Sequence, residues 1–279
     1  MIVLPAATFR FGCDYAWAPH PSGAALKDAG ISFVCRYLSY DSTKNLSIAE
    51  LDNLRSAGIL VVLNWEAGAT DMAFGRGTGV AEAEEAAALA DNLGMSDAPI
   101  YFSADFDADS AQVDACIEYM SGVNSVLGGA RSGVYGDYNV AHACRGADVA
   151  AFSWGTPAWA GEPASWIVDV YQYGSGSISG IGVDLDAAYG TDFGQWPRPV
   201  SPAPKKRIDE PVLQDGDTGA AVKLLQSLLN GRPIHPHLTV DGNFGANTRA
   251  AVELMQHNEH LTVDGVVGPK TWGILGNYS

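Results

Sequence analysis

Short apolar runs alternate with longer amphipathic segments through residues 1–195 of this chain. The runs are rich in β-branched and aromatic residues and have the length of buried strands, whereas the segments between them repeat apolar residues at helical spacing. Several segments end in a glycine, which suits the left-handed residue at a helix C-terminus. We expect strands at 11–15, 32–37, 59–65, 99–105, 131–135, 149–154, 166–172 and 181–186, and helices at 47–57, 80–93 and 110–127.

The alternation of strand and helix predicts the fold class. Eight β/α repeats in about 190 residues indicate an α/β fold, a (β/α)8 TIM-type barrel at the small end of the size range for that architecture. The helical pattern is weakest after residues 154 and 172. A doubly wound open sheet is therefore the alternative.

The composition changes after residue 196. Five prolines and a Lys-Lys-Arg run fall within 197–211, a composition typical of a linker because it cannot build a core. Three copies of Asp-Gly-x-x-Gly follow, each leading into a helical pattern, and turn formation explains the Asp-Gly pairs. The sequence therefore predicts a barrel domain over 1–196, a Pro-rich linker over 197–211 and a small all-α domain of three helices over 212–279.

Acidic residues lie at or just beyond the ends of the expected strands. The C-terminal strand ends of a barrel converge on one face, where active sites are built, so we expect these side chains to meet there. Several other polar and aromatic residues end strands in the same way. The candidate catalytic residues are Asp14, Glu66, Asp105, Asp107 and Asp184, and the candidate substrate-binding residues are Arg36, Tyr135, Trp154, Gln172 and Asp186.

The segment 98–109 carries the densest group of these acids. Alternation along a strand places Tyr101, Ser103 and Asp105 on one face. A buried strand that ends in a carboxylate has little structural reason to do so, because an unpaired acid near a core is costly. Asp107 and Asp109 have an alternative explanation, since either could cap the helix that follows.

A glycine-rich stretch, Gly75-Arg-Gly-Thr-Gly79, resembles a phosphate loop only superficially. It lacks the Lys-Ser/Thr pair of a P-loop and the acidic partner of a dinucleotide fingerprint. We expect a flexible loop over the barrel mouth instead, and no cofactor.

Charge and composition restrict the partners and the compartment. The net charge of −16 argues against a nucleic-acid partner, since a phosphate backbone requires a basic surface. No apolar run has the length of a membrane span, and residues 1–10 lack the features of a secretory signal. We expect a monomer that does not bind membranes and is made in a cytosol. The cysteines fit no zinc spacing, and all four are expected to be reduced: Cys13, Cys35, Cys116 and Cys144.

The C-terminal motifs resemble a known family. The blocks LTVDGNFGANTRAAV (238–252) and LTVDGVVGPKTWGIL (261–275) closely resemble the three-helix peptidoglycan-binding domain that is common in cell-wall hydrolases. This resemblance covers roughly residues 212–276. It implies that peptidoglycan is the binding partner of the C-terminal domain.

The N-terminal part is similar to the glycoside-hydrolase-like barrels related to the family 25 lysozymes, which are muramidases. Four stretches over residues 11–196 carry the resemblance: GCDYAW (12–17), PIYFSADFDA (99–108), VYQYGSG (170–176) and GIGVDLDAAYG (180–190). The resemblance implies an acidic site made of Asp14, Asp105, Asp107 and one of Asp184 and Asp186.

The chain departs from that family on the fourth strand. The muramidases carry Asp-x-Glu there, with the Glu as proton donor, whereas this chain has Asp105-Phe-Asp107, whose second acid is one methylene shorter. Glu66 is the only glutamate among the candidate acids. Its longer side chain makes it the preferred proton donor.

Clustered carboxylates suit glycoside hydrolysis, which needs one protonated and one ionised carboxyl. Crowding and burial raise the pKa of at least one acid in such a cluster. A divalent metal site is the rival use of these acids, although the histidines do not join them. Flat apolar surfaces for sugar rings could come from Trp65, Trp154, Trp159, Trp166 and Tyr135.

The sequence therefore predicts a peptidoglycan hydrolase, a lysozyme-like glycosidase that acts on the glycan of the bacterial cell wall and is held there by its C-terminal domain. The lack of a signal at the N-terminus predicts a phage endolysin that is released from the host cytoplasm to the wall. The alternative is a barrel that binds wall polysaccharide without cleaving it.

Overall fold

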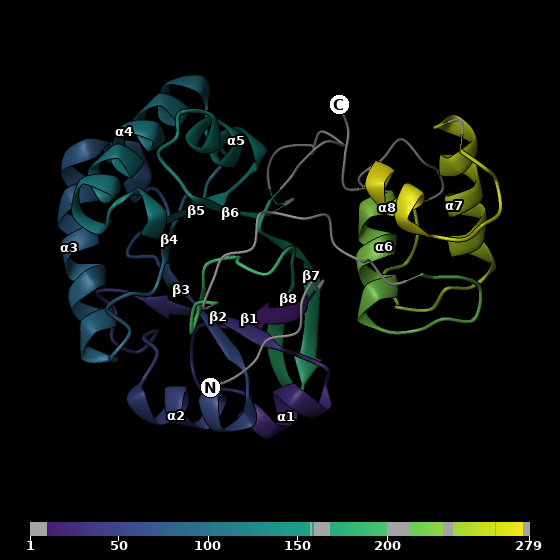
Figure 1. Ribbon diagram of the computed structural model, residues 1–279, viewed down its shortest axis with the longest axis horizontal. Helices are drawn as coiled ribbons and strands as arrows, with labels where there is room; N and C mark the ends of the chain where they lie inside the picture. The colour runs from purple at the N-terminus through teal and green to yellow at the C-terminus, as the bar shows by residue number, and fades with distance from the viewer. Residues whose placement is uncertain are drawn as a thin grey trace. The chain divides into compact units, whose positions relative to one another are not determined.

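The computed structural model describes residues 10–156, 158, 168–199, 212–230, 237–259 and 261–275 (Figure 1). Within these ranges the chain separates into two compact units, one before residue 200 and one after residue 211. Residues 200–211, which are most of the expected linker, lie outside the described residues, as do Trp159 and Trp166.

The first unit is a closed barrel of eight strands. Neighbouring strands pair in sequence order around the barrel, and the β1–β8 pair completes the ring. Closure rules out the open doubly wound sheet and confirms the α/β barrel. The strands are β1 Arg10–Asp14, β2 Phe33–Leu38, β3 Leu60–Trp65, β4 Ile100–Ser103, β5 Ser132–Gly136, β6 Phe152–Gly155, β7 Val170–Ile178 and β8 Ile181–Ala188.

The eighth strand departs from the expected repeat. β8 runs antiparallel to both β7 and β1, whereas the other neighbouring pairs in the ring are parallel. Only Ser179 and Gly180 separate β7 from β8, which is enough for a hairpin but not for the crossover that a parallel neighbour requires. The expected eighth β/α repeat is therefore wrong, because the last two strands form a hairpin.

Helices follow the first five strands and surround them on the outside (Figure 1). Asp109 begins one of them in a reciprocal capping box with Gln112, so capping is the role of Asp109, in line with the alternative explanation. The helices are α1 Gly23–Asp28, α2 Ile48–Ala57, α3 Arg76–Asn92, α4 Ser110–Leu127 and α5 Tyr138–Gly146, with 3-10 turns at Asp71–Phe74 and Gly129–Arg131.

Apolar side chains fill the barrel below the mouth, because every second strand residue points inward. The segment after β8 closes the bottom. There the ring of Phe193 packs against Phe33, with 4.9 Å between centroids, and its carbonyl accepts a hydrogen bond from Tyr101 at 2.7 Å. A short strand, β9 Gln195–Trp196, pairs with the start of β3. The interior residues are Phe33, Cys35, Leu60, Val62, Tyr101, Tyr135, Phe152, Trp154, Val170, Ala188 and Phe193.

The glycine-rich stretch is helical, so the expected flexible loop is wrong. α3 begins at Arg76 and includes Gly77 and Gly79. A Cβ on Gly79 would lie 2.1 Å from the carbonyl oxygen of Tyr119 in α4. A Cβ on Gly122 of α4 would lie 2.4 Å from the carbonyl oxygen of Arg76. These glycines serve close packing of α3 on α4 rather than loop flexibility.

The second unit contains α6 Ala220–Asn230, α7 Ala246–Asn258 and α8 Pro269–Leu275. A buried glutamine ties each of the first two helices to the Asp-Gly turn that follows that helix: Gln226 in α6 and Gln256 in α7. The amides of Gln226 and Gln256 donate to the Asp of that turn at 2.8 and 2.9 Å. Their carbonyl oxygens accept from the backbone N–H of the glycine at 2.8 and 2.9 Å. The turns are thus structural, as expected, and the glutamines are partners that the sequence did not reveal.

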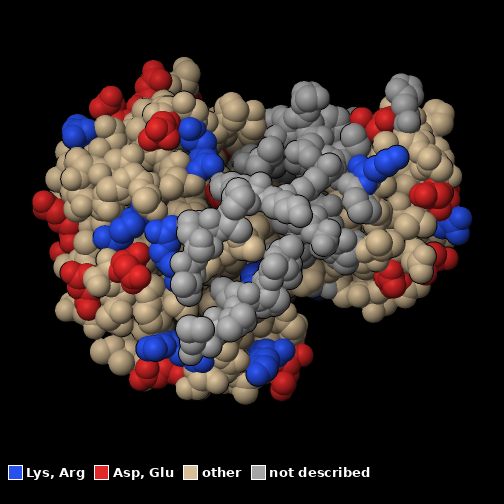
Figure 2. Space-filling model, viewed as in Figure 1, with Lys and Arg blue, Asp and Glu red and all other residues tan. Residues whose placement is uncertain are grey.

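The thiols are internal, and charges of both signs are mixed on the face drawn in Figure 2. All four cysteines are buried and unpaired with one another, as expected for reduced thiols. On the face drawn in Figure 2, acidic and basic side chains are interspersed over the described residues. No helix in the described part of the chain is long and apolar enough to cross a membrane.

Replacing Gly79 with Ala should destabilise the barrel, because the added methyl group would meet the backbone of α4. We expect the free energy of unfolding to fall by about 1–3 kcal/mol. Gly77 is the matched control in the same helix: nothing lies within 4 Å of its Cβ position, so Ala there should add about 0.5–1 kcal/mol. Urea unfolding measures both variants, and equal stabilities would contradict the close packing of α3 on α4.

Candidate active site

Acidic side chains from several strands meet at the barrel mouth, the end at which the parallel strands finish. Asp14 is the last residue of β1, and Asp184 is its antiparallel partner on β8. Asp186 pairs with Gly12, one level deeper in the barrel. The direction of β8 therefore brings these two acids to the site from within the strand, and not from its C-terminal end as the sequence suggested.

Asp14 is buried and held by two side chains. The Tyr37 hydroxyl donates to one carboxyl oxygen at 2.9 Å, and the Gln172 amide donates to the other at 3.1 Å. Tyr135 donates to the Gln172 carbonyl at 3.0 Å, which orients the amide. Burial, and then the neighbouring Asp184, raises the pKa of Asp14 to about 7, although the two hydrogen bonds lower it. Asp14 can therefore carry a proton near neutral pH.

Asp186 and Trp154 support the site from inside the barrel. Both are almost fully buried, and the Trp154 indole N–H donates to Asp186 at 3.0 Å. The second carboxyl oxygen of Asp186 has no hydrogen-bond partner among the described residues. Burial, and then Asp14, raises the pKa of Asp186 well above its usual range. Neither side chain is open to a substrate, so the expectation of direct substrate contact is corrected for both.

The tyrosine and tryptophan surfaces expected to face sugars are also mostly internal. Trp65 is 1% exposed and points outward to α3, where its indole donates to Glu82 at 2.7 Å. Tyr135 is 8% exposed, and its hydroxyl donates to Gln172, which in turn binds Asp14. Gln172 itself is partly exposed and lies against Asp14, as its position at the mouth requires.

Glu66 follows β3 and makes an ion pair. Lys44 Nζ lies 2.5 Å from a Glu66 carboxylate oxygen, and both side chains are largely buried. The ammonium also lies over the rings of Tyr37 and Trp17, at 4.8 and 5.3 Å from their centroids. Such a pair is made by a carboxylate and not by a carboxylic acid, which opposes the expected role of Glu66 as proton donor. Lys44 lies in a loop without a motif, and no sequence pattern pointed to it.

The two acids after β4 have different positions. Asp105 is half-buried, and its backbone N–H donates to the Ala69 carbonyl at 3.0 Å. Burial, and then Glu66, raises the pKa of Asp105, while Lys44 lowers it. Asp107 is exposed at the surface. The structure therefore brings Asp105 close to Glu66, whereas Asp107 is close to Asp137, the N-cap of α5.

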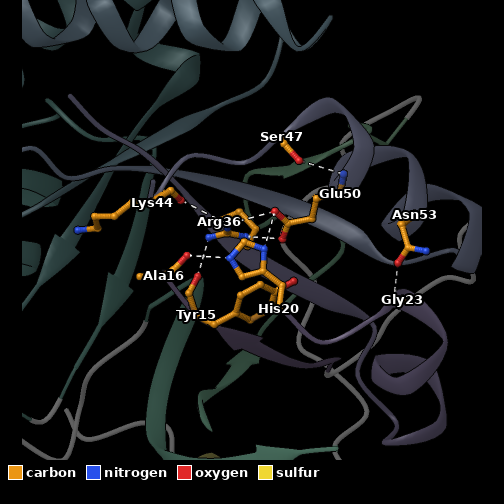
Figure 3. A network of polar contacts seen from close by, with 9 residues as sticks. All are labelled: Tyr15, Ala16, His20, Gly23, Arg36, Lys44, Ser47, Glu50 and Asn53. Carbon is orange, nitrogen blue, oxygen red and sulfur yellow. Dashed lines mark hydrogen bonds and ion pairs between the residues drawn. The ribbon is translucent and has the colours of Figure 1, made fainter. Parts of the chain in front are cut away.

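Arg36 lies on the outer side of the barrel wall, so the expected substrate contact is wrong. Cys35 faces the interior, and alternation along β2 turns the next side chain toward α2. The fully buried guanidinium donates to the two Glu50 oxygens at 2.7 and 3.2 Å (Figure 3). It also donates to the backbone carbonyls of Tyr15 at 2.6 Å and Lys44 at 3.3 Å. Arg36 thus fixes two loops that line the mouth.

His20 extends this network to the loop after β1. Its Nδ1 lies 3.1 Å from Glu50, and its Nε2 lies 3.1 Å from the Ala16 carbonyl (Figure 3). Its ring packs at a tilt against Tyr15, with 5.3 Å between centroids. The segment that follows Asp14 is therefore held by side chains of β2, α2 and its own loop.

The site combines Asp14, whose pKa is raised to about 7, with the Glu66 carboxylate in its ion pair with Lys44. Glu66 is close enough to contribute to the raised pKa values of both Asp14 and Asp105. Carboxyl groups in unequal environments can donate and accept protons in one reaction, which is the requirement of general acid–base catalysis. In the described part of the chain, no three His, Cys, Asp or Glu side chains are placed to hold a metal ion.

Two protein families match the chain. Residues 24–188, more than half of the chain, match the family described as "Rv2525c-like, glycoside hydrolase-like domain". Residues 218–275 match the family described as "Putative peptidoglycan binding domain". The second match agrees with the resemblance seen in the C-terminal motifs. The first supports a glycoside hydrolase-like barrel and does not by itself confirm the resemblance to the family 25 lysozymes.

Three relatives share sequence with the chain. A Mycobacterium tuberculosis protein named "Putative peptidoglycan hydrolase Rv2525c" is 26% identical in an alignment of 199 residues that covers 66% of this chain and 82% of the relative. An uncharacterised protein of Kitasatospora aureofaciens is 46% identical over 24% of this chain and 56% of its own. The zinc D-Ala-D-Ala carboxypeptidase of Streptomyces albus G is 41% identical over 22% of this chain. The chain spans 56% of the Kitasatospora aureofaciens relative and 24% of the Streptomyces albus G relative.

A solved structure has the same fold as the barrel. The Mycobacterium tuberculosis Tat-secreted protein Rv2525c, in complex with L-tartrate, matches with a TM-score of 0.61 at 24% identity, over 67% of this chain and 98% of that chain. Secretion of that protein differs from the phage release expected for this one. Together with the family match over residues 24–188, the fold gives an assignment: the chain belongs to the Rv2525c-like family of glycoside hydrolase-like domains.

Proposed function

We propose that this protein hydrolyses the glycan of peptidoglycan by carboxylate acid–base catalysis, as a muramidase-like enzyme held at the wall by its C-terminal domain. The observation that carries the proposal is the buried Asp14, whose pKa is raised to about 7 by burial and by Asp184. Glycoside hydrolysis needs such a protonated carboxyl beside an ionised one. The two family matches, one glycoside hydrolase-like and one peptidoglycan-binding, support the substrate class.

Asp14 takes the role of proton donor in this proposal, in place of Glu66. Glu66 is paired with Lys44 and serves as a fixed negative charge. Asp105 is half-buried beside Glu66 and stabilises the positive charge that develops on the sugar in the transition state. Asp184 helps to keep the donor protonated, because its own charge disfavours ionisation of Asp14.

A barrel that binds wall polysaccharide without cleaving it is the competing function. Recognition of a sugar uses exposed polar groups and aromatic faces and does not require a carboxyl buried inside a barrel. Burial of Asp14 and Asp186 costs stability, because the charged form of a buried acid is disfavoured. Acids with strongly perturbed pKa values cluster at catalytic sites, which favours hydrolysis.

The setting of the reaction is the cell wall. The peptidoglycan-binding match favours this location, and the Tat-secreted relative favours export over the phage endolysin expected from the sequence. We therefore propose an exported wall hydrolase. Recovery of the protein in the wall or medium fraction of growing cells supports export, whereas recovery only on phage-induced lysis supports an endolysin.

Asp14→Asn should lower the rate of glycan cleavage by about 10²–10⁴-fold, which is the usual contribution of a positioned general acid. Asp105→Asn should lose at least ~10²-fold. Asp109→Asn keeps an oxygen that can cap α4 and should stay near the wild-type rate. The wild-type rate should fall as the pH rises through about 7, where Asp14 loses its proton. Release of reducing ends from purified peptidoglycan measures all of these.

Two results would contradict this account of catalysis. Collapse of activity in Glu66→Gln with a normal rate in Asp14→Asn would return the donor role to Glu66. A pure wild-type protein that releases no reducing ends at any pH would favour the competing function of a binding barrel.

Asp14→Asn should also stabilise the fold above neutral pH. The folded state keeps the Asp14 proton up to a pKa of about 7, whereas an aspartate in the unfolded chain loses it near pH ~4. Stability therefore falls as the pH rises between these two values. We expect the variant to gain on the order of 2–4 kcal/mol at pH ~8 and almost nothing at pH ~4. Unfolding curves at both pH values measure this, with the exposed Asp52→Asn as control, and a variant that gains nothing at the higher pH contradicts it.

Removal of the C-terminal domain should weaken activity on whole walls but not on soluble fragments. Retention near an insoluble substrate raises the effective concentration without changing the chemistry. Residues 209–279 should sediment with purified walls, and residues 1–197 should act on those walls more slowly than the full chain. If residues 209–279 stayed in the supernatant, wall binding would have to be assigned elsewhere.

A further inference from the structure

One large aromatic side chain beside the acids is both exposed and held in place. Trp17 lies three residues after Asp14, in the loop that follows β1, and is 60% exposed. The Lys44 ammonium lies over its ring, 5.3 Å from the centroid, and the same ammonium binds Glu66 at 2.5 Å. Hydrogen bonds from Thr43, with a further one from Trp17, hold the pKa of Asp41 below its usual range. The indole is thus anchored on one side and open to solvent.

Packing alone does not account for this arrangement. Single exposed aromatic residues are common, and Tyr40 is one, at 61% exposure. Tyr40 packs edge-on against Trp65, whose indole is directed to Glu82 of α3, so it belongs to the outer wall of the barrel. Trp17 differs because a buried lysine links it directly to a carboxylate of the site.

The position of Lys44 determines how its ammonium connects Trp17 to Glu66. Arg36 binds the Lys44 backbone carbonyl at 3.3 Å, and Figure 3 shows the Lys44 side chain extending away from that network. Its ammonium then lies between Tyr37, Trp17 and Glu66. A cation held over an aromatic face orients the ring and leaves the opposite face for a ligand.

We propose that Trp17 is a stacking platform for one pyranose ring of the glycan strand, oriented by Lys44 and placed beside the reacting carboxyls. A pyranose has a face of C–H groups and a rim of hydroxyls, so a flat indole can bury the C–H face while the hydroxyls stay in water. This inference rests on the proposed function for the identity of the ligand. It adds a binding site on the β1–β2 side of the mouth.

The test measures binding of a soluble tetrasaccharide of β-1,4-linked N-acetylglucosamine to the full chain, in an Asp14→Asn background that prevents turnover. Trp17→Ala should weaken the Kd at least about tenfold, because a large aromatic anchor supplies a large share of binding energy. Trp17→Phe keeps a ring and should lose less than about threefold. Tyr40→Ala removes an equally exposed ring from the outer wall and should leave the Kd unchanged.

Fluorine NMR locates the contact. Incorporation of 5-fluorotryptophan labels all seven tryptophans, and the signal that is missing in Trp17→Phe identifies Trp17. That signal should shift as the tetrasaccharide is added. A Trp17 signal that does not move at saturation, a Trp17→Ala variant that binds normally, or an absence of any binding would overturn the platform.

Failure of the platform and failure of the proposed function give different results. A wild type that releases no reducing ends, but whose sugar affinity depends on Trp17, would keep the platform and refute hydrolysis. A wild type that cleaves glycan with the same KM as Trp17→Ala would keep hydrolysis and refute the platform.

Discussion

Burial of one carboxyl at the end of β1 is the constraint on which the rest of the site depends. Asp14 lies between β2 and β8, so a closed barrel places Tyr37 on one side of it and Asp184 on the other. The packed interior below excludes water, and desolvation is the largest cause of its raised pKa. Burial therefore disfavours the ionised carboxylate at this position. The same burial raises the pKa of the carboxyl toward neutral pH, which a proton donor requires.

The single antiparallel strand makes this meeting of acids possible. A parallel β8 would bring its last residues, Ala187 and Ala188, to the level of the mouth, and the acids would lie below them. The reversed strand instead sets Asp184 opposite Asp14 and Asp186 one level deeper. Because the hairpin continues past the end of β1, it also extends the barrel wall on that side of the mouth.

The sequence was informative about elements and much less so about the directions of side chains. Apolar runs bounded by glycine located the strands of the ring, and the acids that follow several strands located the mouth. The position of a residue near a strand end does not tell which face of the sheet its side chain occupies, because a shift of one residue moves the side chain to the other face. Arg36 and Asp14 were both expected near strand ends, yet Arg36 lies within β2 and faces α2, whereas Asp14 ends β1 and faces the interior. Lys44 and Trp17 lie in loops without motifs, and only the folded chain brings them to Glu66.

The central claim is that Asp14 holds a proton at neutral pH inside the folded barrel. Carbon-13 NMR of the aspartate side-chain carboxyls tests it most directly, with the Asp14→Asn spectrum to identify the signal. The account predicts a titration midpoint near the raised pKa of about 7. A midpoint near the ordinary aspartate value of about 4 would contradict it.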